Sequence, residues 1–429
     1  MAEIALKKKV DKPQIDKALL SHVGQNDTLH IARGRKQAYE DYLSQELPMR
    51  VGHVWKRARA EQFVPEVSAS LPISDAFMAS RQTGTRNDIQ FLAGSDLFVT
   101  LDAEAARLGV EVKRLDESPV APGQVVPSSR GFFEALNQSL WTTGIYIRVP
   151  AGVRLTSPIH IRSHLDARFP FVRTVLVLEE NASATVLERI GSSSRNGRTV
   201  MVSEVNLHDG AILHHGLVVD LALEDTLHYS HGCRLGNGAT LNLVATSVGS
   251  GRLKADLSGE LDGEGARSEI RTFGVVQDDT ALDFHTRQHH LASHTFSDMK
   301  SRSVLLDRGV SSNTGLIHIG ADARNSEAFQ IARNLMLSKD AEATSIPELE
   351  IENNDVTCSH GSATGPLNPE QLFYLQSRGL SKGVATRLIV EGSLDEILAG
   401  HPVEIQDAFR SAHESVFERL QTERAVGSE

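Results

Sequence analysis

The sequence predicts a mainly β protein whose core is a β-helix, a solenoid of stacked β coils, with helical regions at both ends. Between about residues 140 and 350, short strands of alternating pattern replace helical spacing. A turn phrase recurs within this block at near-constant intervals. Only 2 Trp, 5 Tyr and 15 Phe occur in 429 residues. Aliphatic side chains must therefore form the core, which suits stacked β layers.

The first region, residues 1–135, is predicted to be helical and then mixed. Ala38, Tyr42 and Leu43 recur at near-helical spacing, and Pro48 ends that run. From about residue 61 to 130 prolines interrupt short apolar pieces and favour irregular structure, at Pro65, Pro72, Pro119, Pro122 and Pro127.

The β-helix core is predicted over residues 136–350 from its turn phrases. These phrases begin at Asn181, Asp209, Asn237 and Glu264, which are 28, 28 and 27 residues apart. Each ends on Ala where a new strand begins, and three supply Gly where a positive φ is needed. A two-sheet sandwich, the alternative, has no reason to space these phrases so evenly. After the last phrase Arg308-Gly309 and Asp340-Ala341 fall off the spacing, so the repeat is expected to loosen.

Helices are predicted to return in a C-terminal region, residues 351–429, which also carries Cys358 and His360. Asn368-Pro369 is a good helix start with Gly379 just past its end, and Ser381 can cap a second helix that stops at Gly392. A third helix has one apolar face, made of Ile405, Phe409, Ala412, Val416 and Leu420. That face could cover the solenoid end or meet a partner.

Composition excludes several classes of protein. The formal net charge of −11 leaves no excess of cations for a phosphate backbone, so no nucleic-acid partner is expected. The chain holds no apolar run long enough to span a bilayer and no export signal near its start. We expect a cytoplasmic protein without a membrane partner. Its 2 cysteines cannot build a disulfide framework or a four-thiolate site, so any metal centre must borrow ligands.

Two common catalytic sites are also excluded. The chain has no Gly-Lys dipeptide and therefore no P-loop, so no nucleotide site is expected in it. In the Gly361 to Gly365 segment the central residue is Ala363, which lacks the hydroxyl of a nucleophile elbow.

Histidines are abundant, and two sequence clusters stand out. The first holds His208, His214, His215, His228 and His231, and the second holds His285, His289, His290 and His294. Their spacing fits either a helix face or a strand face, so it does not decide for a metal site. We expect most of them to be surface or stacking residues of the solenoid.

Cys358 and His360 form a more informative pair. In an extended segment they point the same way and present a thiolate and an imidazole to one place. These ligand types suit iron, iron-sulfur clusters and zinc. On these two residues alone, a buried cysteine beside a hydrogen-bonded histidine is the preferred interpretation.

The surrounding sequence changes that preference, because it resembles a known family. Residues 345–351 read SIPELEI, residues 354–361 read NDVTCSHG and residues 371–380 read QLFYLQSRGL. Phrases of this form, in this order, are the signature of the SufB/SufD scaffold family of the Suf iron-sulfur assembly system. The resemblance extends upstream through Arg333-Asn334 and Ala135-Leu136-Asn137. Within the family the chain is most similar to the SufD branch, because cysteines are nearly absent and the segment from Pro48 to Lys56 is similar to a SufD phrase, although Gly52-His53-Val54 departs from it.

The resemblance implies a right-handed parallel β-helix that pairs with a SufB-like paralogue as a heterodimer. It also implies a SufC-like ATPase docked on the C-terminal helical region. His360 would bind iron or a transient iron-sulfur cluster at the subunit interface, with Cys358 assisting. Five residues of the QLFYLQSRGL phrase are also expected to bind a partner: Phe373, Tyr374, Leu375, Arg378 and Gly379.

The resemblance therefore favours a non-catalytic scaffold subunit that assembles and transfers clusters. Two alternatives remain. One is a β-helix enzyme acting on polysaccharide, with Asp278, Asp279 and Asp283 as acid and base. The other is a homodimeric scaffold that works without SufB, in which the chain associates with itself when alone.

Overall fold

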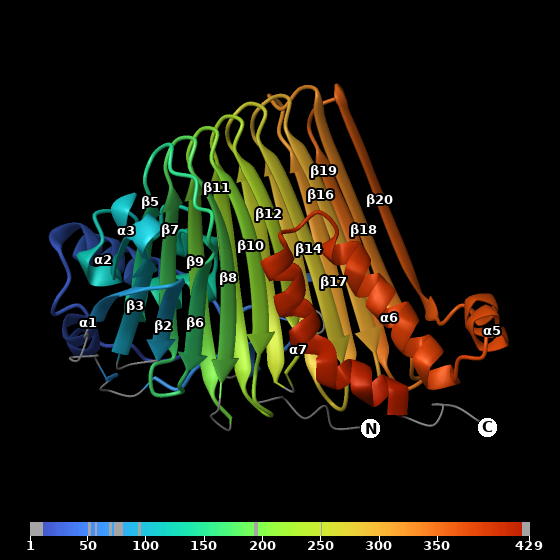
Figure 1. Ribbon diagram of the computed structural model, residues 1–429. Helices are drawn as coiled ribbons and strands as arrows, with labels where there is room; N and C mark the ends of the chain where they lie inside the picture. The colour runs from blue at the N-terminus through green and yellow to red at the C-terminus, as the bar shows by residue number, and fades with distance from the viewer. Residues whose placement is uncertain are drawn as a thin grey trace.

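The computed structural model describes residues 12–49, 53–55, 58–67, 71–72, 80–92, 96–192, 196–249 and 251–422. Its core is a parallel β-helix with two sheets, one of 11 strands and one of 9 strands. From residue 143 to residue 366 successive strands alternate between the two sheets, so each coil adds one strand to each (Figure 1). The fold class predicted from the sequence is confirmed. Lys56, part of the SufD-like phrase, lies outside the described residues.

The N-terminal region contains both helices and strands. Its helices are α1 (Lys17–Val23), α2 (Leu29–Ser44), α3 (Ala103–Arg107) and α4 (Phe132–Leu140). Its strands are β1 (Ser80–Gly84), β2 (Asn87–Leu92), β3 (Asp96–Asp102) and β4 (Glu111–Arg114). β2 pairs antiparallel with β3, and β4 pairs antiparallel with β5. These pairs join the first edges of the parallel sheets.

Sixteen strands follow, from Thr143 to Pro366. Those of the 9-stranded sheet are β5 (Thr143–Val149), β7 (Phe171–Leu178), β9 (Arg198–Leu207), β11 (Thr226–Leu235), β13 (Arg252–Leu261), β15 (Ala281–His290), β17 (Val310–Ile319) and β19 (Glu342–Ile351). Those of the 11-stranded sheet are β6 (Ile159–Leu165), β8 (Ser183–Ser192), β10 (Ile212–Asp220), β12 (Thr240–Ser247), β14 (Arg267–Val276), β16 (Phe296–Leu305), β18 (Ser326–Met336) and β20 (Val356–Pro366).

The predicted turn phrases form one corner of the coil. Asn181, Gly210, Gly238 and Gly265 all have positive φ, between 58° and 71°. The N–H of each donates to a carbonyl of the corresponding turn in the next coil, as Gly238 donates to Glu264 at 2.9 Å. The alanine after each is fully buried and packs in the core, at Ala182, Ala211, Ala239 and Ala266.

This corner continues where the sequence predicted that the repeat would loosen, and its spacing lengthens from 27 residues (265 − 238) to 29 (294 − 265) and 31 (325 − 294). His294 and Asn325 have positive φ of 58° and 52° and make the same hydrogen bond to the next coil. The residue at this position changes from Gly to His and Asn, while the backbone stays the same. Gly309 belongs to a different corner, after Asp307, where φ is 47°.

Helices cover the outer face of each sheet. The N-terminal helices pack on the 9-stranded sheet, where Phe132 and Phe133 of α4 join Tyr146, Phe171 and Val200 in one apolar cluster. The C-terminal helices α6 (Lys382–Leu398) and α7 (Val403–Thr422) lie across the 11-stranded sheet (Figure 1). The apolar stripe of α7 therefore covers a face of the solenoid, and not its end.

The C-terminal region departs from the prediction in two places. The solenoid continues past the expected boundary at residue 350, so Cys358 and His360 lie on a strand. The predicted stop of the second helix at Gly392 is wrong, because α6 continues to Leu398. Leu394, Ile397 and Leu398 bury against the sheet and outweigh the roughly 1 kcal/mol cost of an internal glycine. α5 (Pro369–Ser377) starts after Asn368, which caps it, and Gly379 follows its end with φ of 90°.

The turn corner predicts a selective response at Gly238. A Cβ built there meets no atom within 4 Å, so only its φ of 61° limits substitution. Gly238→Val should destabilise the chain by about 1–2 kcal/mol, because a β-branched residue is strained at positive φ. Gly238→Asn is the control and should cost little, since Asn181 and Asn325 occupy equivalent corners. Urea unfolding midpoints measure both, and equal losses would contradict the explanation.

Candidate functional site

Cys358 and His360 lie on β20, the last strand of the 11-stranded sheet. β20 pairs with β18, and no other described strand lies along its second edge. Its free edge therefore presents unpaired backbone groups, as edge strands do. Cys358 is half-buried and His360 is exposed.

Both side chains face the interior of the solenoid at its open end. Cys358 is in register with Ala328, which is fully buried in the core, and His360 is in register with Gln330. Thr364 lies four residues after His360 and therefore on the same side of β20. It accepts a hydrogen bond at 2.9 Å from the buried Asn334, so this side of β20 faces the interior. No described coil follows, so the two residues lie over the last layer of the core.

The residues expected to bind a partner lie on and after α5, which stands beyond β20 at the end of the molecule (Figure 1). No residue of α5 is buried. Phe373 is 73% exposed and Tyr374 is 57% exposed, and the Arg378 guanidinium lies 5.2 Å from the Tyr374 ring centre. Leu375 is half-buried, and Gly379 is exposed. This end of the chain presents apolar surface to solvent.

The structure divides the two histidine clusters among different environments. Some lie beside another histidine in tilted pairs: the ring centres of His215 and His231 are 5.4 Å apart, and those of His289 and His318 are 5.5 Å apart. However, five members of the two clusters are buried, at His215, His228, His231, His285 and His290. Burial lowers the pKa of His289 and of His290 to about 4, so both rings are neutral at pH 7.

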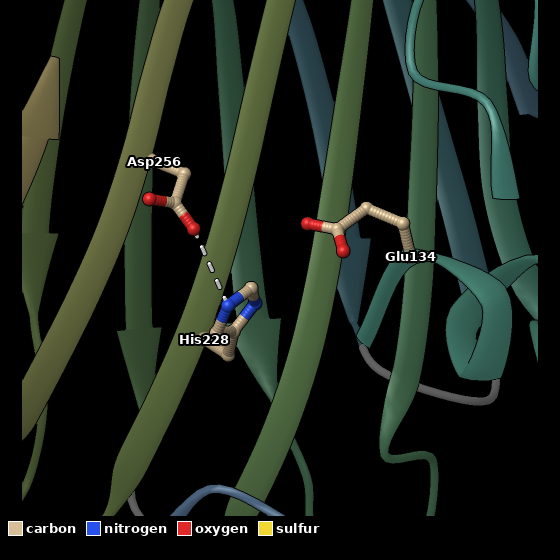
Figure 2. Close-up of side chains that lie close together, drawn as sticks. All are labelled: Glu134, His228 and Asp256. Atoms are coloured by element: carbon tan, nitrogen blue, oxygen red, sulfur yellow. Dashed lines mark ion pairs between the residues drawn. The ribbon is translucent and has the colours of Figure 1, made fainter. Parts of the chain in front are cut away.

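One buried histidine lies in a cluster that sequence reasoning missed. His228 of β11 meets Glu134 of α4 and Asp256 of β13, with one ligand atom of each within 4.8 Å of the others. In Figure 2 the two carboxylates point toward the His228 ring. The exposed fractions of Glu134, His228 and Asp256 are 6%, 1% and 8%, so the cluster is closed to solvent.

A second layer of polar groups surrounds Asp256. His285 Nδ1 lies 2.8 Å from Asp256 Oδ1. Lys254 Nζ lies 3.5 Å from the same Asp256 oxygen and 3.2 Å from Asp283 Oδ1. Burial opposes the charge of Lys254, but these carboxylates outweigh burial and raise its pKa. Burial likewise opposes ionisation of Asp256, but Lys254 and the two imidazoles outweigh it and hold the pKa of Asp256 well below its usual value.

The carboxylates proposed for a polysaccharide-acting enzyme do not gather in a groove. Asp279 is exposed in a turn and forms an ion pair with Arg308 at 2.7 Å. Asp278 lies in the same turn. Asp283 lies within β15, buried and paired with Lys254. The three acids therefore do not make the facing pair that glycoside hydrolysis requires.

Comparison with known proteins identifies the family. Residues 161–393 match the family described as "SUF system FeS cluster assembly, SufBD core domain". This chain belongs to the SufBD family. The match runs from β6 to α6 and contains β20 and α5.

Individual relatives agree with the family. The chain is 27% identical over 291 residues to an iron-sulfur cluster assembly SufBD family protein of Staphylococcus saprophyticus, covering 65% of this chain and 61% of the relative. It is 26% identical over 285 residues to the iron-sulfur cluster assembly protein SufB of Bacillus subtilis, covering 66% of this chain and 61% of that protein. The matches thus span about 61% of the length of these relatives. No helix in the described ranges is long and apolar enough to cross a membrane.

The ion pairs around Asp256 predict a strong effect of removing the buried cation. Lys254→Met should destabilise the chain by about 3–5 kcal/mol, because Asp256 and Asp283 would stay buried without it. Lys113→Met is a matched control, since its pair with Glu111 is about one-third exposed, and should change stability by less than about 1 kcal/mol. Urea unfolding of both variants gives the comparison. Similar losses of stability in the two variants would contradict the larger effect expected of the buried ion pairs.

Proposed function

We propose that this protein is a non-catalytic scaffold subunit of a Suf iron-sulfur assembly complex in the cytoplasm, in the position of SufD. The observation that carries the proposal is the open last coil, where Cys358 and His360 lie beside an unpaired strand edge. Membership of the SufBD family supplies the chemistry, which is cluster assembly. The cargo is iron or a transient iron-sulfur cluster.

The second subunit in this proposal is a SufB-like paralogue that pairs with the open end of the β-helix. The chain offers one imidazole and one thiol at that end, and iron or a cluster needs further ligands. A partner strand along β20 would satisfy its free backbone groups and bring those ligands to the same place. The small number of cysteines in this chain, 2 in all, supports the SufD position because the thiolates then come from the partner.

The third subunit is a SufC-like ATPase that docks on the C-terminal helical region. The exposed aromatic side chains Phe373 and Tyr374 of α5 support this site, because aromatic residues dominate binding energy at interfaces. Since the chain has no P-loop, nucleotide hydrolysis is assigned to that partner. A movement of the ATPase would be transmitted from α5 to β20, because only two residues separate the end of β20 at Pro366 from the start of α5.

The site is tested by His360→Ala in a complex co-expressed with SufB-like and SufC-like partners. We expect the complex to assemble normally, because the side chain is exposed, while iron and cluster yield fall several-fold. Iron, sulfide and absorption spectra measure the yield. His294→Ala is the control, since His294 is also exposed but lies in a turn of another coil. Normal loading of the His360 variant would overturn the site assignment while leaving the subunit arrangement open to its own test.

The docking site is tested by the double variant Phe373→Ser and Tyr374→Ser. We expect ATPase affinity to fall at least about tenfold, as for loss of aromatic anchors, with pairing to the SufB-like subunit unchanged. Leu43→Ser on α2 is the control, because Leu43 is also apolar, is 57% exposed and lies outside the C-terminal helical region. Calorimetric titration of the ATPase measures affinity, and an unchanged value would place the docking surface elsewhere.

A homodimeric scaffold uses the same open edge and differs in the partner. Light scattering of the chain alone and mixed with a SufB-like subunit separates the two. Displacement of any self-pair by the paralogue supports the heterodimer. A self-pair that persists with the paralogue in excess supports the homodimer.

A further inference from the structure

We propose that Glu134, His228 and Asp256 bind one divalent transition-metal ion, Zn²⁺ or Fe²⁺, which fastens α4 to the outer face of the 9-stranded sheet. The three residues come from segments far apart in the chain and meet only in the folded protein (Figure 2). This site is separate from Cys358 and His360 on β20 and does not rest on the function proposed for them.

The first argument is the distance between the candidate ligand atoms. His228 Nε2 lies 3.5 Å from Asp256 Oδ2, which is longer than a good hydrogen bond. Two ligands of one zinc or iron ion, each about 2.1 Å from the metal, lie about 3–4 Å apart. The observed separation therefore suits two ligands of one ion better than a direct bond between them.

The second argument is that binding atoms are left over after the other hydrogen bonds are made. Asp256 uses Oδ1 for His285 and Lys254, and its Oδ2 faces His228. Glu134 Oε1 accepts a hydrogen bond from the Ser230 hydroxyl. His228 Nε2 faces Asp256 Oδ2 and is the nitrogen that would bind the ion, while Nδ1, on the other side of the ring, has no hydrogen-bond partner in the described part of the chain.

The third argument is electrostatic. Lys254 lies between Asp256 and Asp283, so its single charge is shared by two carboxylates. The buried Arg130 is near enough for Glu134 and Asp256 to attract its positive charge, but among the described residues it makes no ion pair with Glu134 and its guanidinium donates to Ser258. A buried carboxylate without a direct ion-pair partner is costly. A divalent ion would balance Glu134 and Asp256 together, and imidazole beside carboxylates favours zinc or iron over magnesium or calcium.

The fourth argument is that the ligands are held in place before binding. The His228 ring stacks on Phe133 at 4.2 Å and on Trp55 at 5.6 Å between ring centres. Ser230 orients Glu134, and His285 orients Asp256. Such partners behind the ligands raise metal affinity. Because α4, β11 and β13 supply one ligand each, the bound ion would link the N-terminal helices to the β-helix.

The test uses the full chain with Cys358→Ser and His360→Ala, so that β20 contributes no metal ligand. After chelator treatment the chain is titrated with Zn²⁺, and with Fe²⁺ under anaerobic conditions, by calorimetry. We expect one ion per chain and a rise in melting temperature, since an ion that binds only the folded state stabilises it. Glu134→Gln and His228→Phe should each weaken affinity at least about tenfold; phenylalanine preserves the ring stacking.

Two further variants keep the proposal falsifiable. Ser230→Ala leaves every ligand in place and should weaken affinity about tenfold through the lost orientation of Glu134, even if the ligand variants fold poorly. The double variant Glu264→Gln and His294→Phe removes the same residue types from an exposed pair 4.0 Å apart and should change nothing. Absence of a one-to-one ion in the parent chain, or unchanged affinity in Glu134→Gln, His228→Phe and Ser230→Ala, would overturn the site.

Discussion

The constraint on which the structure depends is the in-register stacking of coils. Each coil of a β-helix has two faces that only another coil can cover, because its backbone groups and its inward side chains are satisfied by the layer above and the layer below. In this protein the N-terminal strands β1 to β4 extend the first edges of both sheets, and helices cover both outer faces. The last strands, β19 and β20, have no following coil in the described chain. The proposed site at Cys358 and His360 lies on β20, where no further coil of the described chain covers the last layer.

The interior changes character toward that end. In the middle of the solenoid the inward layers are mostly aliphatic, as in Leu213, Leu241 and Leu253. In the last coils the apolar cluster continues, but part of the interior is a hydrogen-bonded polar network, in which Asn334 bonds to Asn313, Ser345 and Thr364. A polar layer loses less free energy in contact with water than an aliphatic one. The open end can therefore be exposed in a single chain and still be covered by a partner strand.

Much of the fold could be predicted because its signals are local. A positive φ favours Gly and Asn, and the Ala that follows must fit the core, so four corners were visible in the sequence. The corner at His294 was hidden because backbone hydrogen bonds to the next coil impose the same φ on a residue without that preference. The end of α6 was misplaced for a similar reason, since packing on the sheet overrides the weak helix propensity of Gly392.

The two candidate sites also differ in how far the sequence alone could predict them. Alternation along one strand was enough to predict that Cys358 and His360 share a face, and the register with Ala328 and Gln330 agrees. The cluster around His228 could not be predicted, because its ligands are separated by many residues and only the coil geometry brings β11 beside β13. The one available signal was Glu134 itself, a carboxylate in an otherwise apolar helix turn.

The two places at which this chain could hold a metal have opposite requirements. Cargo that is passed on must be reached by ligands of another molecule, so its site needs exposure and an incomplete ligand set, as at His360. An ion that stabilises a fold must exchange slowly, so its site needs burial and ligands fixed from behind, as at His228 under Phe133 and Trp55. The stacking of coils provides both, because it seals the middle of the solenoid and leaves its last strand open.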